Sequence, residues 1–298
     1  MKTKLILLAG LALLTSSCDN VIYPSDDTSR VTAPVTVHVR DFSITQSEFP
    51  DEDTRSVTDV KNYDAVKAVT LALFDGNTQV YCSTQIKDKS GNYTTFGQFE
   101  CSLPVGTYTL VAIGRGCFDG DEFTLTSPTA ACYISDRARE TFCYVQTVSV
   151  TSTAPLDISV TMSRVIAQLE IKSTDGRSAD VKKFRTTYPQ GSKSFNPTTG
   201  LATDDAGFKV INSPSAKAGE TVDFGSFVFL ADDEAKMDIT IEALNDNDQV
   251  LFTKVISDVP FKRNRKTVLT GAMFTSSSNS AASIKLDTDW LDPVEMNF

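Results

Sequence analysis

The chain has 298 residues, of which 38 are acidic and 28 are basic, so its formal net charge is −10 at pH 7. This acidic balance leaves no basic patch in which phosphate contacts could cluster, and it argues against nucleic-acid binding. The chain is too long for one small core and suits two domains of ordinary size.

The first residues have the layout of a signal peptide. Lys2 and Lys4 form a short basic region, a stretch of apolar and small residues follows, and Cys18 comes directly after three small residues. The apolar stretch is far shorter than the ~20 residues that a membrane-spanning helix needs. We therefore expect a lipoprotein signal peptide over residues 1–17, cleaved between Ser17 and Cys18.

The position of Cys18 resembles the acylated cysteine of a lipobox, which predicts that its thiol carries palmitate and that it becomes the new N-terminus. The match is imperfect, because Leu14 does not lie three residues before the cysteine. The alternative is an ordinary signal peptide in which Cys18 has no role. Residues 18–34 form an acidic, turn-rich tether, and together these features predict a surface-exposed lipoprotein of the outer membrane.

Short strands separated by Gly, Pro and Asn turns dominate the N-terminal half. Apolar and polar side chains alternate from Val35 to Phe42, which is the period of a half-buried strand. A denser apolar run ends at the tight-turn sequence Asp75-Gly76-Asn77. Strands are predicted over 35–42, 66–74, 80–86, 99–103 and 108–113. This pattern is typical of an antiparallel sandwich.

The same pattern continues from Tyr144 to near the C-terminus. Strands are predicted over 148–150, 158–162, 165–171, 208–211, 221–230, 237–243, 250–256, 267–274 and 283–286. A polar stretch rich in Gly, Pro and Ser covers 173–206, and the only helix that we predict is a short one over 135–142. Pro155 and its Ser and Thr neighbours interrupt the pattern. We therefore predict an all-β chain with an N-terminal β-sandwich over 35–158 and a C-terminal one over 159–298.

Five cysteines remain after cleavage: Cys82, Cys101, Cys117, Cys132 and Cys143. Their spacings contain no C-x-x-C, so a zinc site has little support. An oxidising compartment permits disulfides, but an odd number leaves at least one thiol over. Buried free cysteines that pack as small apolar residues are the other interpretation, and the sequence does not decide between the two.

Enzyme signatures are missing from the chain. The single histidine, His38, lies on the polar side of a predicted strand, where a solvated role is expected. No G-x-S-x-G supports a catalytic triad around it, and the acidic clusters fall at predicted loops. Asp246-Asn247-Asp248 is predicted to be a hairpin turn and not a calcium loop. We expect no catalytic residue, no metal site and no cofactor.

One segment is unusual, since four cations occur within Lys262-Arg263-Asn264-Arg265-Lys266 of a strongly acidic protein. One interpretation is a solvated turn that neutralises its surroundings. The other is a family motif, because the Arg-Asn pair leading into Thr267-x-x-x-Gly271 resembles the closing motif of the fimbrillin superfamily, the type V pilins and their accessory subunits. The segments 35–76, 99–113 and 162–167 resemble other parts of that family in the same order.

This resemblance implies two transthyretin-like β-sandwiches in tandem and a role as a stalk, anchor or tip subunit of surface fimbriae. It also implies assembly with other fimbrial subunits by β-strand exchange, in contact with the outer membrane through lipid and with a host or bacterial surface receptor. The removable first strand is then 35–42. A trypsin-like protease cuts the following loop, 47–59, between Arg55 and Ser56.

Two alternatives remain open. Arg55 can be a solvated loop residue of a subunit that keeps its first strand, while a cut after Arg30 leaves the strand attached. A different class is a surface glycan-binding or nutrient-uptake lipoprotein, which predicts a platform of exposed aromatic side chains. The chain offers only one tryptophan, Trp290.

Overall fold

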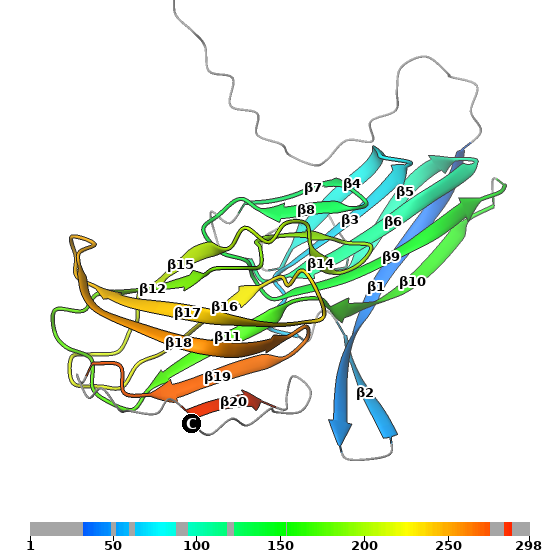
Figure 1. Cartoon of the computed structure of the whole chain (residues 1–298). Helices are drawn as coiled ribbons and strands as arrows, with labels where there is room; N and C mark the ends of the chain where they lie inside the picture. Colours follow the sequence, from blue (N-terminus) through cyan, green and yellow to red (C-terminus); the bar gives the residue numbers. More distant parts are fainter. Residues whose placement is uncertain are drawn as a thin grey trace, which may run out of the picture.

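The computed structural model describes residues 32–48, 52–59, 63–87, 95–117, 122–152, 154–274 and 283–287, and for 40–48, 52–59 and 283–287 it describes the backbone. This part of the chain contains twenty strands and no helix (Figure 1). It therefore holds no helix long and apolar enough to cross a membrane. The prediction of an all-β chain is confirmed.

The strands follow one another with short connections through most of the chain. Those of the first half are β1 (Thr32–Glu48), β2 (Glu52–Asp59), β3 (Ala68–Asp75), β4 (Thr78–Ile86), β5 (Gln98–Pro104), β6 (Gly106–Arg115), β7 (Phe123–Ser127), β8 (Ala130–Tyr133), β9 (Thr141–Val150) and β10 (Leu156–Arg164). Those of the second half are β11 (Ala167–Ser173), β12 (Lys183–Tyr188), β13 (Ser194–Asn196), β14 (Leu201–Ala202), β15 (Phe208–Asn212), β16 (Asp223–Val228), β17 (Glu234–Leu244), β18 (Val250–Lys262), β19 (Lys266–Gly271) and β20 (Ser283–Asp287).

One large sheet occupies the first half, with strand order β2-β1-β10-β9-β6-β3-β4 and with β5 paired to β1. Most neighbours are antiparallel, but β1 and β10 run parallel. The turn between β3 and β4 contains Gly76 at φ +58°, a conformation that glycine adopts at little cost. The apolar faces of these strands enclose one buried cluster that includes Val35, Leu71, Leu110 and Val160.

Two four-stranded sheets form most of the second half, with strand orders β16-β11-β19-β20 and β15-β12-β17-β18. Alternate residues of these strands point into a second buried cluster, in which Phe184 stacks on Phe224 with ring centroids 4.5 Å apart. Two such sheets packed over a shared core form a β-sandwich. The strands predicted over 208–211, 237–243, 250–256 and 283–286 are confirmed as β15, β17, β18 and β20.

A fourth sheet, of order β14-β13-β8-β7, takes strands from both halves of the chain. Its β13–β8 pairing joins Ser194 to Cys132, and the stacked rings of Phe195 and Phe229 lie beneath it with centroids 4.4 Å apart. The third buried cluster therefore also draws on both halves. The division into domains at 158/159 stays a prediction.

Two expectations about the elements are wrong. Residues 135–140 form no helix, and β9 begins at Thr141, because the segment bonds to distant strands instead of to itself: Ala138 bridges to Phe227, and Arg137 donates a hydrogen bond to the Ile211 carbonyl. The polar stretch 173–206 contains β12, β13 and β14, which its composition did not predict.

Candidate functional site: the groove that holds β1

The first strand, β1, lies between two strands that are distant in the sequence. On one side, residues 32–38 pair antiparallel with β5, from Thr32 opposite Pro104 to His38 opposite Gln98. On the other side, residues 35–43 pair parallel with β10, with an irregularity between Val39 and Asp41. Among the described strands, β5 and β10 do not pair with each other, and only β1 joins them.

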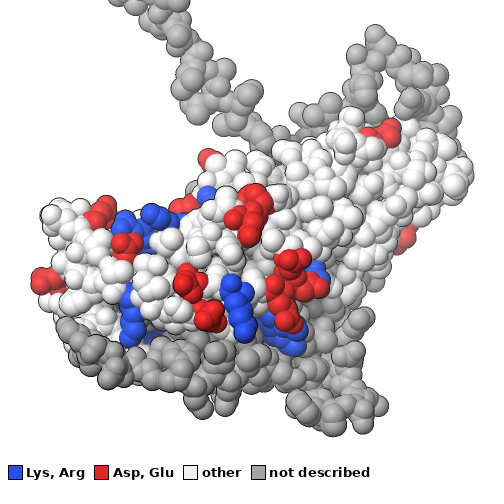
Figure 2. All heavy atoms as spheres, in the orientation of Figure 1, with Lys and Arg blue, Asp and Glu red and all other residues white. Residues whose placement is uncertain are grey.

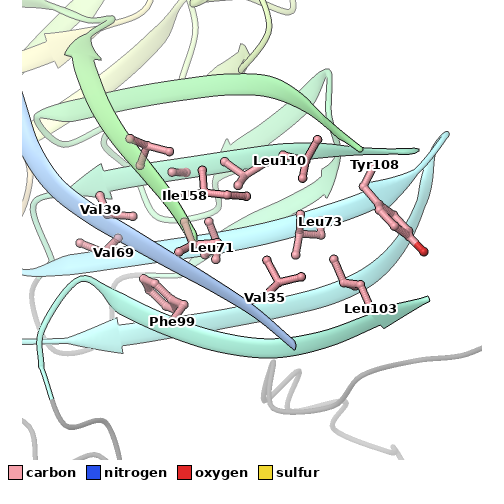
Figure 3. Close-up of a cluster of buried hydrophobic side chains, with 14 of the residues drawn as sticks. Val35, Val39, Val69, Leu71, Leu73, Phe99, Leu103, Tyr108, Leu110 and Ile158 are labelled. Carbon is pink, nitrogen blue, oxygen red and sulfur yellow. The ribbon is translucent and has the colours of Figure 1, made fainter. Parts of the chain in front are cut away.

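From Ala33 to Val39, every second side chain of β1 enters the core. Ala33, Val35, Val37 and Val39 are each no more than 2 % exposed, whereas the intervening Thr36 and His38 are half-buried. Figure 3 shows Val35 and Val39 among side chains of four other strands. The labelled neighbours are Val69, Leu71, Leu73, Phe99, Leu103, Leu110 and Ile158.

This geometry means that β1 fills a groove with two hydrogen-bonding walls and an apolar floor. Each fully buried valine contributes about 1.5–3 kcal/mol relative to an exposed one. If β1 were absent, β5 and β10 would each present a row of unpaired backbone N–H and C=O groups. Such edges pair readily with another extended chain. The groove formed by β5 and β10 is therefore the candidate functional site.

Beyond Asp41, β1 continues into a hairpin with β2. The pairs run from Asp41 opposite Asp59 to Glu48 opposite Glu52, and β2 pairs with no other described strand. Figure 1 shows this hairpin extending away from the body of the molecule. β2 is thus an edge strand that reaches the rest of the fold only through β1.

The predicted loop over 47–59 is wrong, since most of it is β2. Arg55 lies opposite Thr45, and Ser56 lies opposite Ile44, both within the ladder. Its run of acidic residues suggested a loop, but Thr54, Val57 and Thr58 are β-formers that can pair with the second half of β1. A protease that cuts between Arg55 and Ser56 must first open this edge pairing.

His38 is less solvated than its place in the alternation predicts. Its side chain is 17 % exposed, and its Nε2 atom lies 3.3 Å from Oδ1 of Asp157 on β10. This contact joins β1 to the β10 wall at the side of the strand that faces away from the core.

At one end of the groove, four polar residues form what we call the junction network: Tyr63, Glu140, Arg164 and Asn264. Arg164 Nε donates to Glu140 Oε1 at 2.8 Å, Nη2 to the Tyr63 hydroxyl at 2.9 Å, and Nη1 to Asn264 Oδ1 at 3.1 Å. The Tyr63 hydroxyl donates to Glu140 Oε1 at 2.9 Å. Burial and the Glu140 carboxylate raise the pKa of Tyr63 to about 12, so the hydroxyl keeps its proton at neutral pH.

The basic segment around Arg263 is the tight turn between β18 and β19. Three of its cations meet carboxylates: Lys262 pairs with Glu234, Arg263 Nη2 with Asp233 Oδ1 at 2.6 Å, and Lys266 Nζ with Glu170 Oε2 at 3.4 Å. On the face in Figure 2, Lys and Arg side chains lie among Asp and Glu side chains. The turn therefore balances local acidic charge, as one interpretation of the sequence expected.

The same turn also has a structural role that its charge did not reveal. Asn264 adopts φ +59°, its backbone N–H donates to the Ile166 carbonyl at 3.1 Å, and its side chain accepts from Arg164. Two of the sequence motifs, 162–167 and the one that ends at Gly271, therefore meet in space. Their sequence separation gave no signal of this contact.

None of the described cysteines forms a disulfide; these are Cys82, Cys101, Cys117, Cys132 and Cys143. Burial raises the pKa of both Cys101 and Cys143 to about 12, which keeps these thiols protonated. The turn predicted at Asp246-Asn247-Asp248 is confirmed, and the Asn245 side chain accepts hydrogen bonds from the Asn247 and Gln249 N–H groups.

Several predicted positions lie outside the described residues: Ser17, Cys18, Arg30 and Trp290. Within the described ranges, no group of three or more His, Cys, Asp or Glu side chains could hold a metal ion.

Comparisons with solved structures give matches over most of the chain at low identity. A Bacteroides thetaiotaomicron structure, described as that of candidate polysaccharide-binding proteins, is 14% identical with a TM-score of 0.51, and covers 89% of this chain and 98% of its own. A fimbrial anchor protein from Porphyromonas gingivalis is 9% identical with a TM-score of 0.48, covering 86% and 98%. A fimbrial assembly protein from Parabacteroides distasonis is 12% identical with a TM-score of 0.42, covering 90% and 99%.

The first of these likenesses shows a shared fold. The other two neighbours are described as fimbrial proteins. No curated protein matches the chain. A family model matches residues 31–297, so the chain belongs to DUF6562, a family of unknown function.

Proposed function

We propose that this protein is a non-catalytic structural subunit of surface fimbriae, exported as a lipoprotein through Cys18 and assembled by β-strand exchange. Its place is the outer membrane surface, and its partners are other fimbrial subunits. Two tandem transthyretin-like sandwiches provide the body of the subunit. Whether it serves as stalk, anchor or tip depends on whether β1 leaves.

The observation that carries the proposal is the setting of β1. It is the first strand that the structure describes, it is held on both sides by strands that do not pair with each other, and its inward side chains from Ala33 to Val39 are small or β-branched. A strand in this position can leave without breaking any other pairing except that with β2. An incoming strand then completes the sheet by β-augmentation.

The groove sets conditions for an incoming strand. It must run parallel to β10 and antiparallel to β5, as β1 does. Its side chains at alternate positions must be about the size of alanine or valine, because Ala33, Val35, Val37 and Val39 fill the available space. Fimbrial proteins among the structural neighbours support an assembly role of this kind.

Release of β1 requires a cut in the chain beyond it, and Arg55 is the proposed position. A cut between Arg55 and Ser56 divides β2 and leaves β1 attached only through backbone pairing and side-chain burial. Because β2 lies at an edge, it can open without disturbing the central strands.

The test is limited digestion of the lipid-free precursor with an arginine-specific protease, followed by mass spectrometry and an unboiled gel. We expect a single cut after Arg55 and a ladder of multimers. Arg55→Ala should abolish both, whereas the matched variant Arg30→Ala should abolish neither. A protein that remains uncut, or that is cut but stays monomeric, would contradict a stalk subunit with a removable β1, and would favour an anchor or tip subunit or the glycan-binding alternative.

A glycan-binding lipoprotein is the alternative, and the description of one structural neighbour gives it some basis. Such a site needs exposed aromatic rings, and among the described residues the exposed large apolar side chains include one aromatic, Phe252. Binding to a glycan array by the intact chain would favour this alternative.

A further inference from the structure

The junction network joins segments from four parts of the chain. Tyr63 precedes β3, Glu140 precedes β9, Arg164 ends β10, and Asn264 lies in the turn between β18 and β19. The side chain of Arg164 is 2 % exposed and that of Glu140 is 10 % exposed, so their charges are held almost wholly within the protein.

The aromatic ring of Phe142 packs against two members of the network. The Arg164 guanidinium carbon lies 4.9 Å from the centroid of this ring, and the Tyr63 ring meets the same ring edge to face at 5.6 Å. A guanidinium with a carboxylate, a hydroxyl and an amide as acceptors is well satisfied, and a lysine cannot reproduce this fork. The network is therefore neutral overall and rigid in its geometry.

The network lies where the pairing of β1 with β10 ends. Ser43 opposite Ser163 is the last pair of that ladder, and Arg164 is the next residue of β10. On the other side, Tyr63 is separated from the end of β2 by only three residues. Tyr63 is therefore held in the core at the point where the chain leaves the β1–β2 hairpin.

We propose that Tyr63 and Arg164 are positioning residues that hold the end of the groove in place when β1 leaves. This role rests on the proposed strand exchange and adds to it. Departure of β1 removes pairing partners from β5 and β10, and also from residues 56–59, which stay joined to β3 after the cut. Tyr63, bonded to Glu140 and Arg164, keeps the start of β3 and the end of β10 in place, so that opening stops at the hairpin.

Backbone hydrogen bonds next to the junction network support this positioning role. Val66 N–H donates to the Tyr63 carbonyl at 3.3 Å, and Lys67 N–H donates to the Arg115 carbonyl of β6 at 2.9 Å. Val165 N–H donates to the Thr141 carbonyl at 3.0 Å. The segment before β3 and the end of β10 are thus tied to the central strands β6 and β9, respectively, by hydrogen bonds that do not involve β1.

The test is site-resolved hydrogen exchange on the full, lipid-free chain. In the wild type we expect amides of 33–39 to exchange faster than those of 108–113, because β1 opens on its own. In Tyr63→Phe, the amides of 66–70 and of Val165, whose hydrogen bonds do not involve β1, should lose about tenfold in protection and exchange together with β1.

Tyr188→Phe is the matched control, because it also removes a buried tyrosine hydroxyl, which bonds to Ser226 Oγ at 2.7 Å in the second half. Tyr188→Phe should leave the ratio between the exchange rates of the β1 amides and the β10 amides unchanged. If Tyr63→Phe does not fold, Asn264→Gly removes a single acceptor from Arg164 without straining the left-handed backbone at this position, and gives a milder form of the same test.

The outcomes separate the two proposals. If β1 opens first but Tyr63→Phe and Tyr188→Phe behave alike, the positioning role is overturned and strand exchange stands. If β1 in the wild type is as protected as β6, strand exchange is overturned, and the positioning role falls with it. Joint exchange of β1, 66–70 and Val165 only in Tyr63→Phe supports both.

Discussion

At the scale of single residues, Tyr63 links stability to pH. Its pKa is raised from 10.0 to about 12, first by burial and then by the Glu140 carboxylate. A group whose pKa is raised by folding stabilises the fold fully below its unfolded pKa, and that contribution is lost as the pH rises through the folded pKa. The relevant window therefore runs from about pH 10 to pH 12.

Tyr63→Phe should lower the free energy of unfolding by about 1–2 kcal/mol at pH 8, because the hydroxyl makes two hydrogen bonds to charged partners. The difference from the wild type should shrink as the pH rises from 10 to 12, since only the wild type loses the contribution of the protonated hydroxyl. Urea unfolding at several pH values measures this. A difference that grows with pH would contradict the assignment.

The buried thiols give a second test at this scale. Burial raises the pKa of Cys101 and Cys143 to about 12 from 9.0, so very little thiolate is present at pH 8. We expect both to resist iodoacetamide in the native protein and to react once urea is added. Mass spectrometry of the alkylated peptides reads this directly. Rapid native labelling of either thiol would mean that its strand opens locally.

The sequence motifs contain Arg164 and Asn264, but nothing in the sequence indicates that these two residues are in contact. Their side chains meet at 3.1 Å across a separation of 100 positions. Tyr63 and Glu140 carried no signal at all, because a tyrosine before a strand and a glutamate before another strand are ordinary in composition. Only the fold brings the four together.

At the scale of elements, the alternation of β1 makes its two faces unequal. Val37→Asn places a polar amide at a site that is 0 % exposed, and we expect it to cost about 2–5 kcal/mol. Thr36→Asn introduces the same side chain on the opposite face and should cost less than about 1 kcal/mol. If thermal unfolding shows that both variants lose the same stability, the two faces of β1 are not buried unequally as described.

The edge strand β18 exposes an apolar patch, comprising Val250, Leu251, Phe252 and Val255. Val255 is 57 % exposed, and β18 pairs in its own sheet only with β17 among the described strands. Exposed apolar edges promote association. Val255→Lys should reduce light scattering at high concentration with little change in unfolding temperature. Thr253→Lys, at a polar position of the same strand, is the control and should have a smaller effect.

Hydrophobic periodicity predicted a strand correctly where the local residue pattern matches the burial of that strand in the fold. The run over 66–74 became β3 because nearly every residue of that strand is buried on both faces. The acidic stretch that contains Arg55 became β2 because the second half of β1 supplies a partner for it. Pairing of that kind is a non-local interaction, and composition does not report it.

At the scale of the whole molecule, the predicted anchor can be tested without reference to the fold. Cys18→Ala should move the protein from the membrane fraction to the soluble fraction and abolish labelling by radioactive palmitate. In a lipoprotein, lipid is attached to this cysteine through a thioether on the side chain and an amide on the amino group. Labelling that persists in the variant would therefore contradict lipoprotein export. Ser17→Ala keeps a small residue at the cleavage site and should leave labelling intact.

The sequence by itself determined the strand-rich class of the protein, the order of most strands and the export signal that we predict, because each depends on residues close together in the chain. The tertiary structure decided which strands are neighbours. β1 meets β5 across at least 60 positions and β10 across at least 120, and the Arg164 motif meets the Asn264 turn. These contacts depend on burying apolar faces and satisfying backbone groups over the whole fold at once, so no local pattern specifies them.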